Sequence, residues 1–166
     1  NAYRELVESG LYTDEDMFPK IAHKSRDNAR TPMQWDASEN ACFTTGTPWI
    51  AVNPNYKKIN VADQLKREDS VFHYYQNLIR LRKENEIIVY GNYELLLPED
   101  ENIFAYTRTL DNQKLLVVCN FSKSEQKFDF SGYENAKVLI SNYNRDARED
   151  GILKPYEATV LLLENA

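Results

Sequence analysis

The chain is short of the residues that most often build catalytic, metal and phosphate sites: its 166 residues include five glycines, two cysteines and two histidines. Neither G-x-x-x-x-G-K nor G-x-G-x-x-G occurs, so a glycine-rich phosphate loop is not expected. His23 and His73 fall in different segments without an obvious third group, which favours surface histidines over a catalytic base. Cys42 and Cys119 have no partner at metal-ligand spacing. We therefore expect reduced thiols in a cytoplasmic protein, with no metal site and no cofactor.

The sequence also has no long apolar run and no cluster of basic residues. No stretch approaches the roughly 18 apolar residues of a membrane-spanning helix, and residues 1–5 lack the apolar run of a signal peptide. With 26 acidic and 20 basic side chains and a net charge of −6, the chain fits neither a nucleic-acid partner nor an anionic membrane. Its length excludes a complete (β/α)₈ barrel, which needs roughly 250 residues. Because it starts with Asn1 inside a helical pattern, we expect a processed or truncated piece of a longer protein.

Hydrophobic periodicity predicts helices over residues 1–24 and 71–84, with an ordered loop between them. Thr13 precedes three acidic residues and is expected to cap a second N-terminal helix, which Pro19 should make short or late in starting. Residues 25–60 hold both tryptophans and three of the six prolines and show no regular period, so they are expected to form a long ordered loop. Asp69 or Ser70 is expected to cap the helix over 71–84.

From residue 87 the apolar pattern switches to a period of two, which predicts short strands. The continuous apolar run 114–121 is typical of a strand buried on both faces, and Leu110–Gln113 has the composition of a hairpin turn. The other predicted strands are Ile87–Tyr90, Tyr93–Leu97, Ile103–Thr109, Gln126–Phe130, Lys137–Ser141 and Ala158–Leu163. Seven or eight short strands predict an antiparallel β-sandwich, so the chain as a whole is expected to be α+β.

The segment Lys24–Asp36 gathers polar groups suited to recognition, with two arginines, Arg26 and Arg30, beside two amides and Trp35. Guanidinium groups and amides match the hydroxyls of a sugar, and an indole can cover an apolar sugar face. A simpler interpretation is that Arg–Asp pairs tie the loop to its own domain. Composition alone favours this structural interpretation over a polyol-binding surface.

The run Ser25–Asp36 resembles a signature of the α-amylase superfamily of glycoside hydrolases, family 13, and in particular of its bacterial exo-acting α-glucosidases. The resemblance continues in the same order through Phe43–Ile50, Val52–Tyr56, Ile59–Val61, Leu78–Lys83, Val89–Gly91, Ile103–Tyr106 and Leu153–Ala158. It implies the C-terminal end of a (β/α)₈ TIM barrel over residues 1–90, followed by an antiparallel β-sandwich domain over residues 91–166.

The same resemblance implies a parent enzyme of the oligo-1,6-glucosidase type, which hydrolyses terminal α-glucosidic bonds of short oligosaccharides with retention. That reaction needs two carboxyl groups about 5 to 5.5 Å apart, and the resemblance places them upstream of this chain. The chain alone is therefore expected to be inactive, with the upstream barrel portion as its partner. Trehalose-6-phosphate hydrolases share this half, so their activity is one alternative. A noncatalytic structural or carbohydrate-binding module is another, compatible with 12% aromatic residues.

Carried over residue by residue, the resemblance makes Arg26 the expected substrate-binding residue, in contact with the glucose unit at the catalytic end of the pocket. Asp27 and Arg30 are expected to hold the loop to the barrel, and Trp35 to pack beneath it. This chain departs from the pattern at Cys42, where relatives commonly have glycine. If that glycine serves a positive φ, Cys42 is strained.

Overall fold

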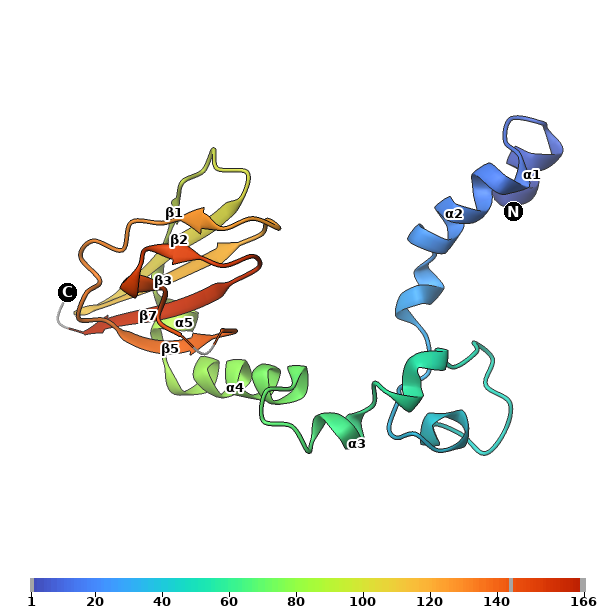
Figure 1. The fold of residues 1–166 in the computed structure, drawn as a ribbon, viewed down its shortest axis with the longest axis horizontal. Helices are drawn as coiled ribbons and strands as arrows, with labels where there is room; N and C mark the ends of the chain where they lie inside the picture. The colour runs from blue at the N-terminus through green and yellow to red at the C-terminus, as the bar shows by residue number, and fades with distance from the viewer. Residues whose placement is uncertain (1, 144, 165–166) are drawn as a thin grey trace. The chain divides into compact units, whose positions relative to one another are not determined.

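A computed structural model describes residues 2–143 and 145–164, which divide into two compact units between Phe72 and His73 (Figure 1). In this described part, the first unit consists of short helices and turns, and the second holds the strands. None of the described helices has the length and apolar character that crossing a bilayer requires.

Helices α1 (Ala2–Glu8) and α2 (Asp14–Lys24) open the first unit and confirm the predicted helical character of this end. Thr13 caps α2 as predicted, because its Oγ1 accepts from the backbone N–H of Asp16 while the Asp16 carboxylate accepts from the N–H of Thr13. The prediction that Pro19 shortens or delays the helix is wrong, since α2 continues through it. A proline in the second turn removes a single backbone donor, and the capping box with its acidic first turn offsets that loss.

The segment between α2 and α3 (Val61–Gln64) is the predicted ordered loop. Its regular structure consists of three 3₁₀ turns, η1 (Arg26–Ala29), η2 (Glu39–Cys42) and η3 (Pro54–Lys57). Asn60, only 3% exposed, ends the loop and caps α3 by accepting from the N–H of Asp63 at 2.9 Å. The loop is therefore ordered by its own hydrogen-bonded turns and caps.

Asn40, Ala41 and Cys42 form a left-handed turn, with φ angles of 52°, 56° and 55°. Left-handed backbone costs roughly 1 to 2 kcal/mol for each residue that has a Cβ. The fully buried Ala41 holds the turn, because its carbonyl accepts from the N–H of Trp35 at 3.0 Å. The positive φ of Cys42 confirms the strain expected of a side chain at this position.

Helix α4 (Val71–Glu84) has the predicted bounds, but Ile87–Tyr90, predicted as a strand, is instead the helical turn α5. Tyr90 donates its N–H to the Glu86 carbonyl at 2.8 Å, and Gly91 to that of Ile87 at 3.1 Å. The β-branched run has strand propensity, yet the packing of Ile87, which is 1% exposed, against the sheet decides its conformation. At Gly91 a Cβ would lie 2.5 Å from the Ile87 carbonyl oxygen, so the turn can close only on glycine.

The second unit holds a five-stranded antiparallel sheet in the order β1-β2-β3-β7-β5 and a two-stranded sheet of β4 and β6 (Figure 1). The strands are β1 (Asn92–Leu96), β2 (Ile103–Leu110), β3 (Gln113–Asn120), β4 (Gln126–Lys127), β5 (Lys137–Ser141), β6 (Ile152–Leu153) and β7 (Ala158–Glu164). The hairpin turn Leu110–Gln113 is confirmed, with Asp111 at a φ of 48°. β4 is shorter than the predicted strand Gln126–Phe130. β6 is absent from the prediction, because a strand of two residues is too short to show a period.

The five-stranded sheet is apolar on both faces. Its inner face forms the main core with Leu153 of β6 and with residues of the connecting segments, and the buried members are Ile103, Ala105, Leu116, Val118, Phe130, Ala136, Ala147, Leu153 and Leu161. On the outer face, Ile87 of α5 packs against Leu115, Val117 and Leu162. This arrangement is the predicted β-sandwich, and the helices before it complete the predicted α+β class.

Arg148 holds the segment between β5 and β6 in place. Its Nε donates to Asp146 at 2.9 Å, and its Nη1 donates to the carbonyls of Tyr133, Glu134 and Ala136 at 2.7, 3.0 and 2.7 Å. The hydrogen bonds from Arg148 hold the pKa of the Asp146 carboxyl below its ordinary value.

Arg145 organises the turn before β7. The side chain of Glu157 is fully buried, and its carboxylate accepts from Arg145 Nε at 3.2 Å and from the Lys154 N–H at 2.7 Å. Arg145 also donates to Asp150 at 3.1 Å. The buried carboxylate is tolerated because it is both paired and hydrogen-bonded.

We expect Asp146→Asn to remove part of the acid sensitivity of the second unit, while the asparagine side-chain oxygen can still accept from the Arg148 N–H, as Asp146 does at 3.0 Å. Because Arg148 lowers the folded-state pKa of Asp146, the pair stabilises fully above the unfolded pKa of about 3.9 and loses its effect as the pH falls through the lower folded value. The free energy of unfolding should fall by about 1 to 2 kcal/mol at neutral pH, with little difference left near pH ~2.

Urea unfolding followed by circular dichroism across this pH range checks the expectation. Glu125→Gln is the control, because it removes an exposed pair with Lys154 in the same unit and should cost less than about 0.5 kcal/mol. A loss for Asp146→Asn that does not vary with pH would contradict the prediction.

Cys42→Gly should stabilise the first unit by about 1 kcal/mol, because glycine adopts a positive φ without steric cost. The thiol of Cys42 is lost in exchange. Thermal unfolding of both proteins measures the change. Cys42→Ala removes the thiol but keeps the Cβ, so an equal gain in both variants would rule out backbone strain as the cause.

Candidate functional site

Arg26 is the first residue of η1 and directly follows the C-cap of α2. Its side chain is exposed, and its guanidinium makes no hydrogen bond or ion pair with any other residue that the structure describes. An arginine with all its donors free can hold a carboxylate or a pair of neighbouring hydroxyls. The candidate site is therefore built around this side chain.

Hydrogen bonds of Ser25, before Arg26, and of Asn28, after it, fix the backbone that carries Arg26. Ser25 Oγ accepts from the N–H of Asp27 at 3.4 Å and so caps η1. The Asn28 side-chain amide donates to the Ala22 carbonyl at 2.7 Å, which joins η1 to the last turn of α2. Sequence reasoning did not single out Ser25 or Asn28, although a serine followed by an Asp-Asn pair at the end of a helical pattern is a readable capping signal.

Asp27 and Arg30 form an ion pair at 3.2 Å across η1, with both side chains about half exposed. Within this chain the pair closes the turn that carries Arg26. That these two residues hold the loop to a barrel stays a prediction. An exposed pair at this spacing contributes little to stability, so its effect is on the shape of the turn.

Trp35 is held through its backbone and is 49% exposed. Its carbonyl accepts from the Ala62 N–H at 2.9 Å, and the Gln34 carbonyl accepts from the Val61 N–H at 2.9 Å. These bonds tie the end of the signature to α3. The described residues cover only about half of the surface of Trp35, so its packing beneath the loop stays a prediction.

A hollow of about 690 Å³ lies in the first unit, lined by residues of segments 31–34, 59–64 and 67–71. Gln34 is fixed there by a hydrogen bond from its amide to the Ile59 carbonyl, and Arg67 pairs with Asp69 at 3.2 Å. Arg26 is not among its lining residues. Sequence reasoning missed this hollow, and the amides of Gln34, Asn60 and Gln64 were its only readable signal.

The remaining candidate residues are two histidines and two cysteines, and each pair is divided between the two units. His23 lies in α2 and His73 in α4, in different units. Cys42 and Cys119 are both free. Among residues 2–143 and 145–164, no group of three or more histidine, cysteine or acidic side chains has the arrangement of a metal site.

Comparison with known sequences assigns both parts of the chain. Residues 4–91 match the family "Alpha amylase, catalytic domain", and residues 103–160 match "Alpha-amylase SusG C-terminal domain". An oligo-1,6-glucosidase of Parageobacillus thermoglucosidasius is 52% identical over 96% of this chain and 30% of its own length. A trehalose-6-phosphate hydrolase of Bacillus subtilis is 44% identical over 98% of this chain, again 30% of its length.

Solved structures agree with the sequence matches. The trehalose-6-phosphate hydrolase of Bacillus licheniformis superposes on 98% of this chain with a TM-score of 0.86 at 44% identity. An isomaltulose synthase of Erwinia rhapontici superposes with a TM-score of 0.87 at 40% identity. This chain covers 30% of each of these structures. Since the catalytic-domain match spans more than half of its residues, the chain belongs to the α-amylase family and carries the end of the catalytic domain followed by a β-sandwich domain.

Proposed function

We propose that this chain is the C-terminal part of a retaining, exo-acting α-glucosidase of the oligo-1,6-glucosidase type, acting on terminal α-glucosidic bonds of short oligosaccharides. The observation that carries the proposal is 52% identity to an oligo-1,6-glucosidase over nearly the whole chain. Residues 1–90 complete the barrel of the parent enzyme and residues 91–166 form its sandwich domain. The free thiols of Cys42 and Cys119 support a cytoplasmic location.

Arg26 is the substrate-binding residue of the proposed site. Its unpaired guanidinium stands on a turn fixed by Ser25 and Asn28, so it can donate to the hydroxyls of the terminal glucose unit without first breaking other bonds. The two carboxyl groups of the reaction come from the barrel portion that precedes this chain in its relatives. This chain contributes substrate binding and orientation. The upstream barrel portion of the same protein contributes the two reacting carboxyl groups.

Trehalose-6-phosphate hydrolysis is the second candidate, favoured by the matches to two hydrolases with that name at 44% identity. Turnover of isomaltose against trehalose 6-phosphate by the full-length protein separates the two activities. Clear preference for the phosphorylated disaccharide would replace the first proposal by the second.

Arg26→Ala in the full-length enzyme should lower kcat/KM for isomaltose by about 10- to 100-fold, the effect of losing a hydrogen bond from a charged donor. Arg30→Ala is the matched control, because it removes the same charge from the same loop but from a residue already paired with Asp27. Steady-state kinetics of the two variants measure the difference. Equal losses in both would show that Arg26 acts through loop structure and not through substrate contact.

The 166-residue chain alone should release no p-nitrophenol from p-nitrophenyl α-glucoside, since the catalytic carboxyl groups lie outside it. The measurement uses purified chain with the full-length enzyme as the positive control. Release that Arg26→Ala abolishes would place the catalytic pair within this chain and overturn the proposed division of roles.

A further inference from the structure

A single non-helical residue, Ser25, separates α2 from the 3₁₀ turn η1 that carries Arg26. Its backbone is extended, with φ of −63° and ψ of 127°, and its N–H donates back into α2, to the Ile21 carbonyl at 2.8 Å. The remaining carbonyls in the last turn of a helix have no donor inside that helix. The direction in which η1 leaves α2 therefore depends on what binds these carbonyls.

Asn28 supplies a donor that the end of α2 lacks. Its side-chain amide donates to the Ala22 carbonyl at 2.7 Å, six residues back along the chain. Within the described part of the chain, no other hydrogen bond joins η1 to α2. Arg30, by contrast, binds Asp27 inside the turn, through its backbone N–H at 3.0 Å and through its ion pair. These internal bonds close the turn, whereas the Asn28 bond fixes its orientation on the helix.

The orientation of η1 decides where Arg26 can reach. The Arg26 side chain is exposed and its guanidinium binds no other described residue, so within this part of the chain its backbone alone directs it. Groups that bind a reacting substrate have to be held within about 0.5 Å and 10 to 20° of their productive geometry. A tilt of η1 moves the base of this long side chain, and a misplacement of about 1 Å can cost about 100-fold in rate.

We propose that Asn28 is a positioning residue of the substrate site: its bond to the Ala22 carbonyl determines the direction from which Arg26 meets the sugar. The proposal rests on the proposed function, in which Arg26 binds the terminal glucose unit. Asn28 makes no contact with the substrate in this scheme. Its effect on kcat/KM therefore requires the Arg26 guanidinium, whereas the effect of a residue that touches the sugar, or that only stabilises the fold, is independent of Arg26.

A double-mutant cycle in the full-length protein tests this dependence. Asn28→Ala should lower kcat/KM about 5- to 20-fold by itself, and less than about twofold when Arg26→Ala is already present. Asn28→Asp keeps a side-chain oxygen but loses the donor, so it should lower kcat/KM at least as much as Asn28→Ala does. The substrate is isomaltose or trehalose 6-phosphate, whichever the protein hydrolyses.

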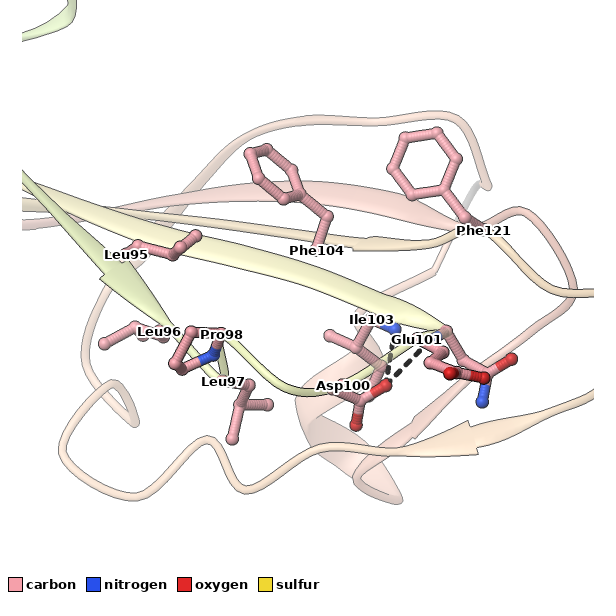
Figure 2. Close-up of a pocket in the computed structure, with 10 residues that line it drawn as sticks. Leu95, Leu96, Leu97, Pro98, Asp100, Glu101, Ile103, Phe104 and Phe121 are labelled. Atoms are coloured by element: carbon pink, nitrogen blue, oxygen red, sulfur yellow. Dashed lines mark hydrogen bonds between the residues drawn. The ribbon is translucent and has the colours of Figure 1, made fainter.

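Two side chains of the second unit hold backbone in a similar way and serve as controls. At the end of α4 the Asn85 amide donates to the Leu81 carbonyl at 2.9 Å, which is the same kind of bond. Between β1 and β2 the Asp100 carboxylate accepts from the Ile103 N–H at 2.8 Å (Figure 2). Asn85→Ala and Asp100→Ala should each change kcat/KM less than about twofold, because neither side chain holds the turn that carries Arg26.

Hydrogen exchange in the full-length protein gives a measurement that does not depend on activity. In η1 the Asn28 N–H donates to the Ser25 carbonyl at 3.1 Å and the Arg30 N–H to that of Asp27. Exchange in a peptide that spans residues 25–31 should become about tenfold faster in Asn28→Ala, because the turn loses its attachment to α2. Arg26→Ala should leave this exchange unchanged, since the guanidinium binds no other described residue.

Equal fold losses from Asn28→Ala with and without Arg26 overturn the proposal, and so does unchanged exchange in residues 25–31. Full activity of Asn28→Asp also overturns it, because the side-chain oxygen would then be the group that matters. An active enzyme with any of these results contradicts only the positioning role. A protein that hydrolyses neither disaccharide contradicts the proposed function, and the exchange measurement then decides by itself whether Asn28 orients η1.

Discussion

The second unit depends on one constraint, which is that its central strand β3 is apolar on both faces. Leu116 and Val118 belong to the main core and Leu115 and Val117 to the outer cluster, and none of the four is more than 9% exposed. Such a strand cannot face water on either side, so each face of the sheet needs a cover. The inner face is covered by the segments that carry the short strands β4 and β6. Because these strands supply few ladder hydrogen bonds, the segments are held by Arg148, which donates to backbone carbonyls, and by the buried carboxylate of Glu157. On the outer face the helical turn α5 covers Leu115, Val117 and Leu162, and other parts of that face stay exposed.

Elements with a strong local signal could be predicted from the sequence, and elements decided by packing could not. The apolar run of β3, the hairpin after β2 and the Thr13 cap each depend on residues close together in the chain, and all three are confirmed. The β-branched residues of Ile87–Tyr90 predict a strand, whereas the burial of Ile87 against β3 and β7 favours a helical turn. β6 has two residues and exists only because β4 lies beside it.

The candidate site also has one part that the sequence predicts and other parts that it does not. Arg26 could be named from the signature that contains it, but nothing in the sequence showed that its guanidinium would be free while Arg30, in the same turn, is paired. Whether an arginine of η1 is paired depends on where the turn places its side chain. Ser25 and Asn28 fix that turn through hydrogen bonds to neighbouring backbone groups. The hollow of the first unit could not be predicted, because its lining comes from three segments separated in the sequence, 31–34, 59–64 and 67–71.

Gly91 makes the passage from α5 to β1 a rigid joint. A side chain there would meet the Ile87 carbonyl oxygen at 2.5 Å and the Arg108 Cβ at 3.0 Å, and Arg108 donates to the Gly91 carbonyl at 3.0 Å. The catalytic-domain match ends at this same residue. A side chain at residue 91 would therefore disturb the α5 turn and the start of the sheet at the same time, so this one position couples the two elements within the second unit.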